Sequence, residues 1–151
     1  MILDAMFELS DDQDIGELTA TEVAASTNVI NFTTSDLEMG AGEPLYLNVK
    51  MGTEALLSTG AATCTFSLMS ESDGTIDTDS STVWSETIAK ASLTAGAWVW
   101  RRQLPYDIDR DGYMGLLYTM NTAPASAGKV DTWIDHGPQS SYDTQVSASN
   151  I

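Results

Sequence analysis

The sequence has few basic residues: six lysines and arginines stand against 22 aspartates and glutamates, which gives a formal net charge of -16. Lys50 is the only basic residue before position 80, so the N-terminal half carries most of the negative charge. A surface of this kind repels nucleic acids and anionic lipids, and it favours solubility. The composition therefore argues against binding to nucleic acid or to a membrane surface.

Long hydrophobic runs are also missing. No apolar stretch approaches the roughly 20 residues that a membrane-spanning helix needs. Residues 1–8 lack the basic start of a secretory signal peptide and are interrupted by Asp4 and Glu8. These features predict neither a membrane anchor nor a cleaved leader.

Cysteine and histidine occur once each. Cys64 has no disulfide partner within the chain and shares one face of an expected strand with Phe66 and Leu68, which predicts a buried, inert thiol. A catalytic cysteine would depend on His136, and a histidine metal site would need several histidines. No phosphate-binding loop, zinc-ligand set or nucleophile–base pair is visible either. We therefore expect neither an enzyme nor a cofactor.

The chain does contain a series of short strand patterns. In residues 45–51 apolar and polar side chains alternate with a period of two, which is typical of a half-buried strand. Similar patterns bounded by Gly, Pro, Asp, Asn or Ser predict further strands. The expected strands cover residues 2–9, 28–32, 45–51, 62–69, 83–88, 98–105, 113–120 and 128–135. Residues 10–26 are acidic and polar, and they predict a loop with one helical turn near residues 22–24.

This regular succession of short strands and turns predicts an all-β fold. An antiparallel β-sandwich accommodates it, and strands of this length suit a jelly roll of about eight strands best. By length the chain forms one domain, which we place at residues 1–136. Residues 137–151 are polar and aperiodic, and we expect a C-terminal tail, or an arm that docks on a neighbour.

An aspartate-rich segment at residues 107–112 matches the first six positions of a calcium loop. Asp107, Asp109 and Asp111 alternate ahead of a glycine, as convergent oxygen ligands at a sharp turn require. The twelfth position, however, is Tyr118 where a bidentate glutamate belongs, and Arg110 adds a competing positive charge. An acidic turn between two strands is therefore favoured over a calcium site.

Aromatic and basic residues gather in residues 98–135, which hold three of the four tryptophans and four of the six basic residues. A regular strand would place Trp98, Trp100 and Arg102 on one face, with Arg101 on the other. Tryptophan and arginine are enriched at binding hot spots, although a core role for the tryptophans is the alternative. The residues predicted to contact a protein partner are Met1, Leu3, Trp98, Trp100, Arg101, Arg102 and Tyr142.

Five segments recur in one order in a known family: MILDA at 1–5, ASTNVI at 25–30, GAGEPLYL at 40–47, LTAG at 93–96 and AGKVD at 127–131. Together they resemble the small capsid cement, or decoration, proteins of tailed bacteriophages. The resemblance covers positions 1 to about 135, and the order and spacing of the segments carry it. The chain departs from the family pattern in its more acidic residues 10–20 and its aspartate-rich residues 105–112, both of which fall in expected turns.

The resemblance implies a jelly-roll protein that binds the outer surface of an assembled phage head. It implies a small homo-oligomer, a dimer or a trimer, that lies across the joints between capsomers of the major capsid protein. The protein would then belong to the virion exterior, after assembly in the host cytoplasm. A jelly-roll carbohydrate-binding module is the alternative, with Trp98, Trp100 and calcium at Asp107, Asp109 and Asp111, because one fold hosts both functions.

Overall fold

The computed structural model describes residues 7–33, 44–105 and 111–135. These residues form eleven strands and a short 3-10 helix, η2 (Lys90–Ser92). The strands are β1 (Glu8–Asp14), β2 (Val23–Ala25), β3 (Ile30–Asn31), β4 (Tyr46–Met51), β5 (Leu57–Ser58), β6 (Thr63–Glu71), β7 (Ser81–Ala89), β8 (Trp98–Gln103), β9 (Tyr113–Asn121), β10 (Ala125–Ala127) and β11 (Lys129–Asp135).

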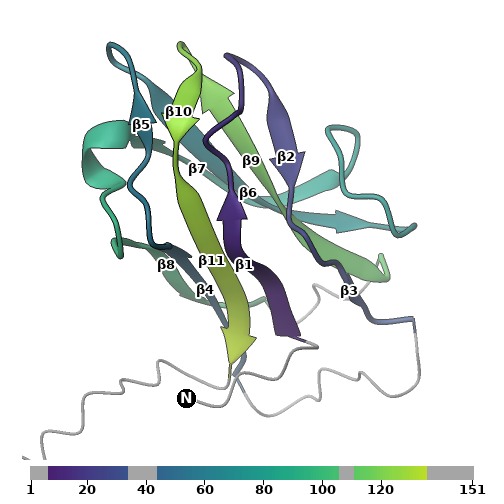
Figure 1. Ribbon diagram of the computed structural model, residues 1–151. Helices are drawn as coiled ribbons and strands as arrows, with labels where there is room; N and C mark the ends of the chain where they lie inside the picture. Colours follow the sequence, from purple (N-terminus) through teal and green to yellow (C-terminus); the bar gives the residue numbers. More distant parts are fainter. Residues whose placement is uncertain (1–6, 34–43, 106–110, 136–151) are drawn as a thin grey trace, which may run out of the picture.

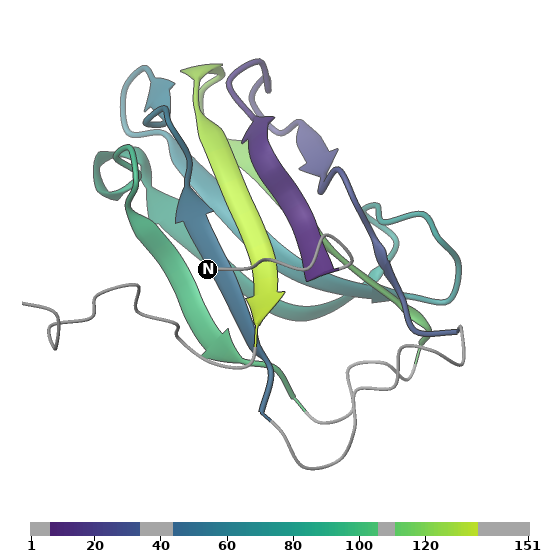
Figure 2. The ribbon, with the colours of Figure 1, turned by 60° about the horizontal axis from the view of Figure 1, so that its bottom comes forward.

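The strands build two antiparallel sheets that face each other (Figure 1). One sheet has the order β1-β11-β4-β8, and it lies in front in Figure 2. The other has the order β2-β9-β6-β7, with β3 also paired to β9. Since β2 and β3 act as one interrupted strand on β9, each sheet is four strands wide, and only the small β10-β5 pair stands apart. This arrangement confirms the predicted all-β jelly-roll sandwich.

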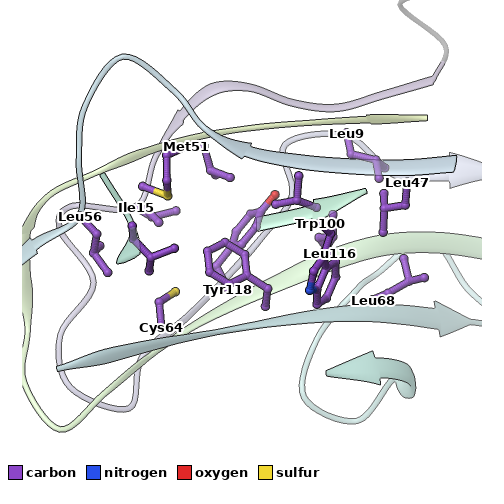
Figure 3. Packing of buried hydrophobic residues seen from close by; sticks show 14 of the residues in the cluster. Leu9, Ile15, Leu47, Met51, Leu56, Cys64, Leu68, Trp100, Leu116 and Tyr118 are labelled. Atoms are coloured by element: carbon purple, nitrogen blue, oxygen red, sulfur yellow. The ribbon is translucent and has the colours of Figure 1, made fainter. Parts of the chain in front are cut away.

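The core lies between the two sheets. It is built from the residues that point inward along each strand, which alternate with residues that point outward. On β6 the side chains of Cys64, Phe66 and Leu68 are fully buried, as the period-two pattern predicted. The Phe66 ring meets the rings of Trp100 and Tyr118 edge to face, with centroids 6.3 and 5.8 Å apart. Figure 3 shows Trp100, Tyr118 and Leu116 between the two layers.

One polar contact crosses this core. The Tyr118 hydroxyl, on β9, lies 2.8 Å from Ser10 Oγ on β1 and 3.0 Å from Thr132 Oγ1 on β11. A buried hydroxyl is tolerated when it is hydrogen-bonded, and these two bonds fix the second sheet against the first. Burial raises the pKa of Tyr118 to about 12, so the phenol remains neutral.

The expectation of a loop at residues 10–26 was wrong in two places. Residues 10–14 belong to β1, which pairs with β11, and Val23–Ala25 pair with β9 as a strand rather than a helical turn. The inward side chains of β1 include Ser10 and Gln13, which form hydrogen bonds inside the protein, so no alternating apolar signal marks this strand. The register against β11 also slips, with Asp12 at a φ of 44°.

The other predicted strands are confirmed where the structure describes them. β4, β6, β7, β8, β9 and β11 each overlap the predicted range by most of their length. Of the predicted strand at residues 2–9, only positions 7–9 are described, and β1 begins at Glu8. The predicted tail at residues 137–151 lies outside the described residues.

Candidate interaction surface

A β-bulge in β8 separates the two tryptophans that the sequence placed on one face. Trp100 pairs with Val49 of β4, and Trp98 pairs with Lys50, the next residue of β4. Val99 therefore has no partner on β4 and is the extra residue of the bulge. An extra residue reverses the alternation of side chains beyond it. Trp100 therefore points into the core and is 2% exposed, whereas Trp98 lies on the outer face and is 43% exposed. The prediction of a shared face was wrong for Trp98.

Trp100 and Arg102 do share the inner side of β8, and both contact one carboxylate. The Trp100 indole N–H donates to Glu86 Oε2 at 2.9 Å, and the Arg102 guanidinium forms an ion pair with the same oxygen. Glu86 lies on β7, an edge strand of the opposite sheet. This carboxylate therefore links the edges of the two sheets, and the role of Trp100 is in the core rather than on the surface.

Two cations lie close to the Trp98 ring on the outer face. The Arg101 guanidinium carbon lies 3.7 Å from the centroid of the Trp98 ring, and Lys50 Nζ lies 6.0 Å from it. Trp133, from β11, packs beside the same ring with centroids 5.6 Å apart. The bulge thus brings Arg101, which the sequence placed on the opposite face, onto the same side as Trp98. We call Trp98, Arg101 and Lys50 the Trp98 patch.

The other described basic residues are engaged within the chain. Lys129 forms an ion pair with Asp12 at 2.9 Å, and the Lys90 ammonium donates to the carbonyl oxygen of Ser58. Arg102 is paired with Glu86. By contrast, no carboxylate of the described residues forms an ion pair with Arg101 or Lys50. The Trp98 patch is therefore a local concentration of positive charge on a strongly acidic protein.

Several residues predicted for a site or an interface lie outside the described residues: Met1, Leu3, Asp107, Asp109 and Tyr142. Asp111 is exposed and accepts a hydrogen bond from Ser70 Oγ at 3.0 Å. Within the described ranges, no group of three His, Cys, Asp or Glu side chains is placed to hold a metal ion. The pair of surface tryptophans that a carbohydrate-binding module would use is not formed, because Trp100 is buried.

The single thiol is buried, as predicted. Cys64 has no exposed surface in the core, and burial raises its pKa to about 12. Because the thiolate is the nucleophilic form of cysteine, this side chain is unreactive at neutral pH. Within the ranges that the structure describes, no helix has the length and apolar character needed to cross a membrane.

A second surface, on the opposite side of the sandwich, was not predicted from the sequence. On β6 it consists of the outward residues Thr63, Thr65 and Ser67. These alternate with the buried Cys64, Phe66 and Leu68, and they are joined by hydroxyl-bearing residues of β7 and β9. The alternation of threonine and serine with apolar residues was the available signal.

The architecture and the Trp98 patch define a jelly-roll protein with an exposed indole and two nearby cations on one outer face. Comparison of sequences then gives the family: the Bbp16 family model matches residues 9–134, so the chain belongs to the Bbp16 family. The match begins in β1 and ends in β11, and it therefore spans both sheets. None of the curated proteins compared with the chain matches it.

Proposed function

We propose that this protein is a capsid cement protein. It binds the exterior of an assembled tailed-phage head as a homo-oligomer and clamps adjacent capsomers of the major capsid protein. The observation that carries the proposal is the Trp98 patch, in which Arg101 stacks on an exposed indole and Lys50 lies nearby. The identity of the partner comes from the five sequence segments described above, whose order and spacing resemble those of cement proteins.

The Trp98 patch has the features of a protein-binding hot spot. Tryptophan and arginine dominate such sites, since each offers a large contact area together with hydrogen-bond donors. Stacking on Trp98 holds the guanidinium of Arg101 in place, so little side-chain entropy is lost when a partner binds. An apolar side chain flanked by a carboxylate is the complementary group on the partner.

Stabilisation of the head then follows from mass action. A protein that binds only the assembled shell lowers the free energy of that shell by its own binding free energy. An oligomer that touches two or three capsomers gains further from effective concentration, so that a modest contact per subunit is sufficient. No catalytic step is required, and we propose none.

The strong negative charge fits an exterior position. A net charge of -16 keeps the decorated particle soluble and disfavours contact with packaged DNA. It also limits where the protein can touch an acidic partner. A contact through the Trp98 patch avoids this repulsion, because its cations face the partner directly.

The test is to mix the purified protein with expanded heads that lack it and to image the particles by electron microscopy. We expect regular added density on the outer surface and a higher melting temperature of the heads. Trp98→Ala combined with Arg101→Ala should weaken binding about tenfold or more. Leu57→Ala is the matched control, because Leu57 is the other exposed large apolar side chain of the described residues, at 56%, and lies on β5. Heads that remain bare with saturating wild-type protein would disprove the proposed function.

A further inference from the structure

Strand β8 forms one edge of the first sheet. The sheet has the order β1-β11-β4-β8, so β8 pairs with β4 on one side and with no strand of the described residues on the other. Figure 2 shows it as the left-hand border of the front sheet. An edge strand presents a row of unpaired N–H and C=O groups, which is a template for a further strand.

One backbone hydrogen bond shows which residues of β8 face this free side. The Leu104 N–H donates to the carbonyl oxygen of Leu45 at 2.8 Å. In an antiparallel ladder, hydrogen-bonded pairs alternate with pairs whose backbone groups point away from each other. Gln103 and Arg101 lie one and three residues before Leu104, in a stretch where the register is regular. Their N–H and C=O groups therefore point away from β4, toward the free side.

The same two residues have their side chains on the outer face of the sheet. Arg101 stacks on Trp98 there, and Gln103 lies two residues further along the strand, on the same face. All three side chains are exposed. A strand added to β8 therefore places every second side chain beside the Trp98 patch. The free backbone edge and the candidate interaction surface form one site.

The local charge of this edge is positive. Arg101 and Lys50 lie in the Trp98 patch, whereas the opposite border of the same sheet, β1, has the acidic sequence ELSDDQD. Charges are screened beyond about 8 Å at physiological ionic strength, so the nearby cations outweigh the more distant carboxylates of the chain. Two copies of β8 paired edge to edge would bring arginine next to arginine, which is destabilising. An acidic extended segment of another protein is the complementary partner.

We propose that an acidic, extended segment of the partner adds to β8 as a new edge strand of the first sheet. Backbone hydrogen bonds to Arg101 and Gln103 align the segment. A carboxylate on its outer face pairs with Arg101, and an apolar side chain further along the same face covers Trp98. In this mode of binding, main-chain bonds give affinity and alternate side chains give specificity. The inference rests on the proposed function for the identity of the partner, the major capsid protein.

Proline at position 103 tests the backbone contact. Proline has no N–H group, and an edge strand tolerates it where that group faces solvent. Gln103→Pro should therefore leave the melting temperature of the isolated protein nearly unchanged and prevent the addition of a strand. Gln103→Thr is the matched control, because it changes the side chain and keeps the N–H. Arg102→Pro removes an N–H that faces β4, and it should lower the melting temperature strongly.

Binding is measured on heads that lack the protein and on an array of overlapping peptides, of about twelve residues each, that cover the major capsid protein. We expect the wild type and Gln103→Thr to bind heads and at least one acidic peptide. Gln103→Pro should bind both at least tenfold more weakly. The same loss is expected when the bound peptide is N-methylated at alternate residues, because its backbone can then no longer pair with β8.

Three results would overturn the inference. Binding of heads and peptides by Gln103→Pro as tight as by the wild type would show that the free edge is not used. A melting temperature of Gln103→Pro as low as that of Arg102→Pro would show that the edge is already paired within the chain. Oligomers of the wild type that Gln103→Pro abolishes, measured by sedimentation velocity, would assign the edge to a second copy.

The two assays also separate this inference from the proposed function. If the wild type binds heads but no peptide, the strand addition is wrong and the proposed function stands. If an acidic peptide binds through its backbone but heads remain bare, the edge is a binding site and the proposed function is wrong.

Discussion

The two tryptophans of β8 show how a single inserted residue changes the role of its neighbours. In a regular register Val99 would pair with Lys50, Trp98 would point toward the core beside Trp100, and Arg101 would have no aromatic ring to stack on. With the bulge, one indole fills the core and the other reaches the surface. Bulges are common where a strand must redirect a side chain for a particular purpose.

Because Trp100 is buried and Trp98 is partly exposed, their replacement by alanine should lower the free energy of unfolding by different amounts. Trp100→Ala removes a buried ring and leaves the Glu86 carboxylate without its indole donor, so we expect a loss of about 3–5 kcal/mol in the free energy of unfolding. Trp98→Ala removes a partly exposed ring and its cation–π contacts with Arg101 and Lys50, and the loss should be about 1 kcal/mol or less. Urea unfolding followed by circular dichroism measures both. Equal losses would show that Trp98 is also a core residue.

At the level of strands, the sequence was informative wherever one face is apolar and the other polar. β4 and β6 follow this rule, and their ranges and inward residues were predicted. Residues 10–14 of β1 were not predicted, because Ser10 and Gln13 form hydrogen bonds within the chain and leave no apolar stripe. The bulge in β8 was not visible either, since it depends on the register against β4, which no local pattern records.

For the candidate surface, the arrangement of the β8 side chains predicted from the sequence was wrong. Trp98, Arg101 and Arg102 were identified from composition, but the strand alternation paired Trp98 with Arg102 instead of Arg101.

Glu86 gives a prediction for the contact between the edges of the two sheets. Glu86→Gln keeps an acceptor for the Trp100 indole but loses the ion pair with Arg102. The two side chains of this ion pair, Arg102 and Glu86, are 45% and 40% exposed. Exposed pairs contribute about 1 kcal/mol at most, so this variant should be nearly as stable as the wild type. Glu86→Ala removes the acceptor as well, leaves the indole N–H unsatisfied and should cost about 1–3 kcal/mol. Thermal unfolding of the two variants ranks them, and a larger loss for Glu86→Gln would contradict this assignment.

For the whole molecule, the imbalance of charge is the dominant physical feature. Carboxylates crowd a sandwich whose described cations are mostly committed to internal partners, and their mutual repulsion opposes the compact state. Binding of a carboxylate partner to the Trp98 patch should weaken as salt rises, because salt screens the attraction between the cations of the patch and that carboxylate.

This imbalance also predicts how the isolated domain responds to salt. Screening the repulsion at neutral pH should raise the melting temperature, and a gain of about 1 kcal/mol corresponds to about 2–4 °C for a domain of this size. Near the isoelectric point, about pH 4.1, the net charge vanishes and so should the effect of salt. Differential scanning calorimetry at low protein concentration, with sodium chloride varied at both pH values, measures the two shifts. A melting temperature that falls with salt at neutral pH would mean that local ion pairs, such as Lys129 with Asp12, outweigh the repulsion between carboxylates.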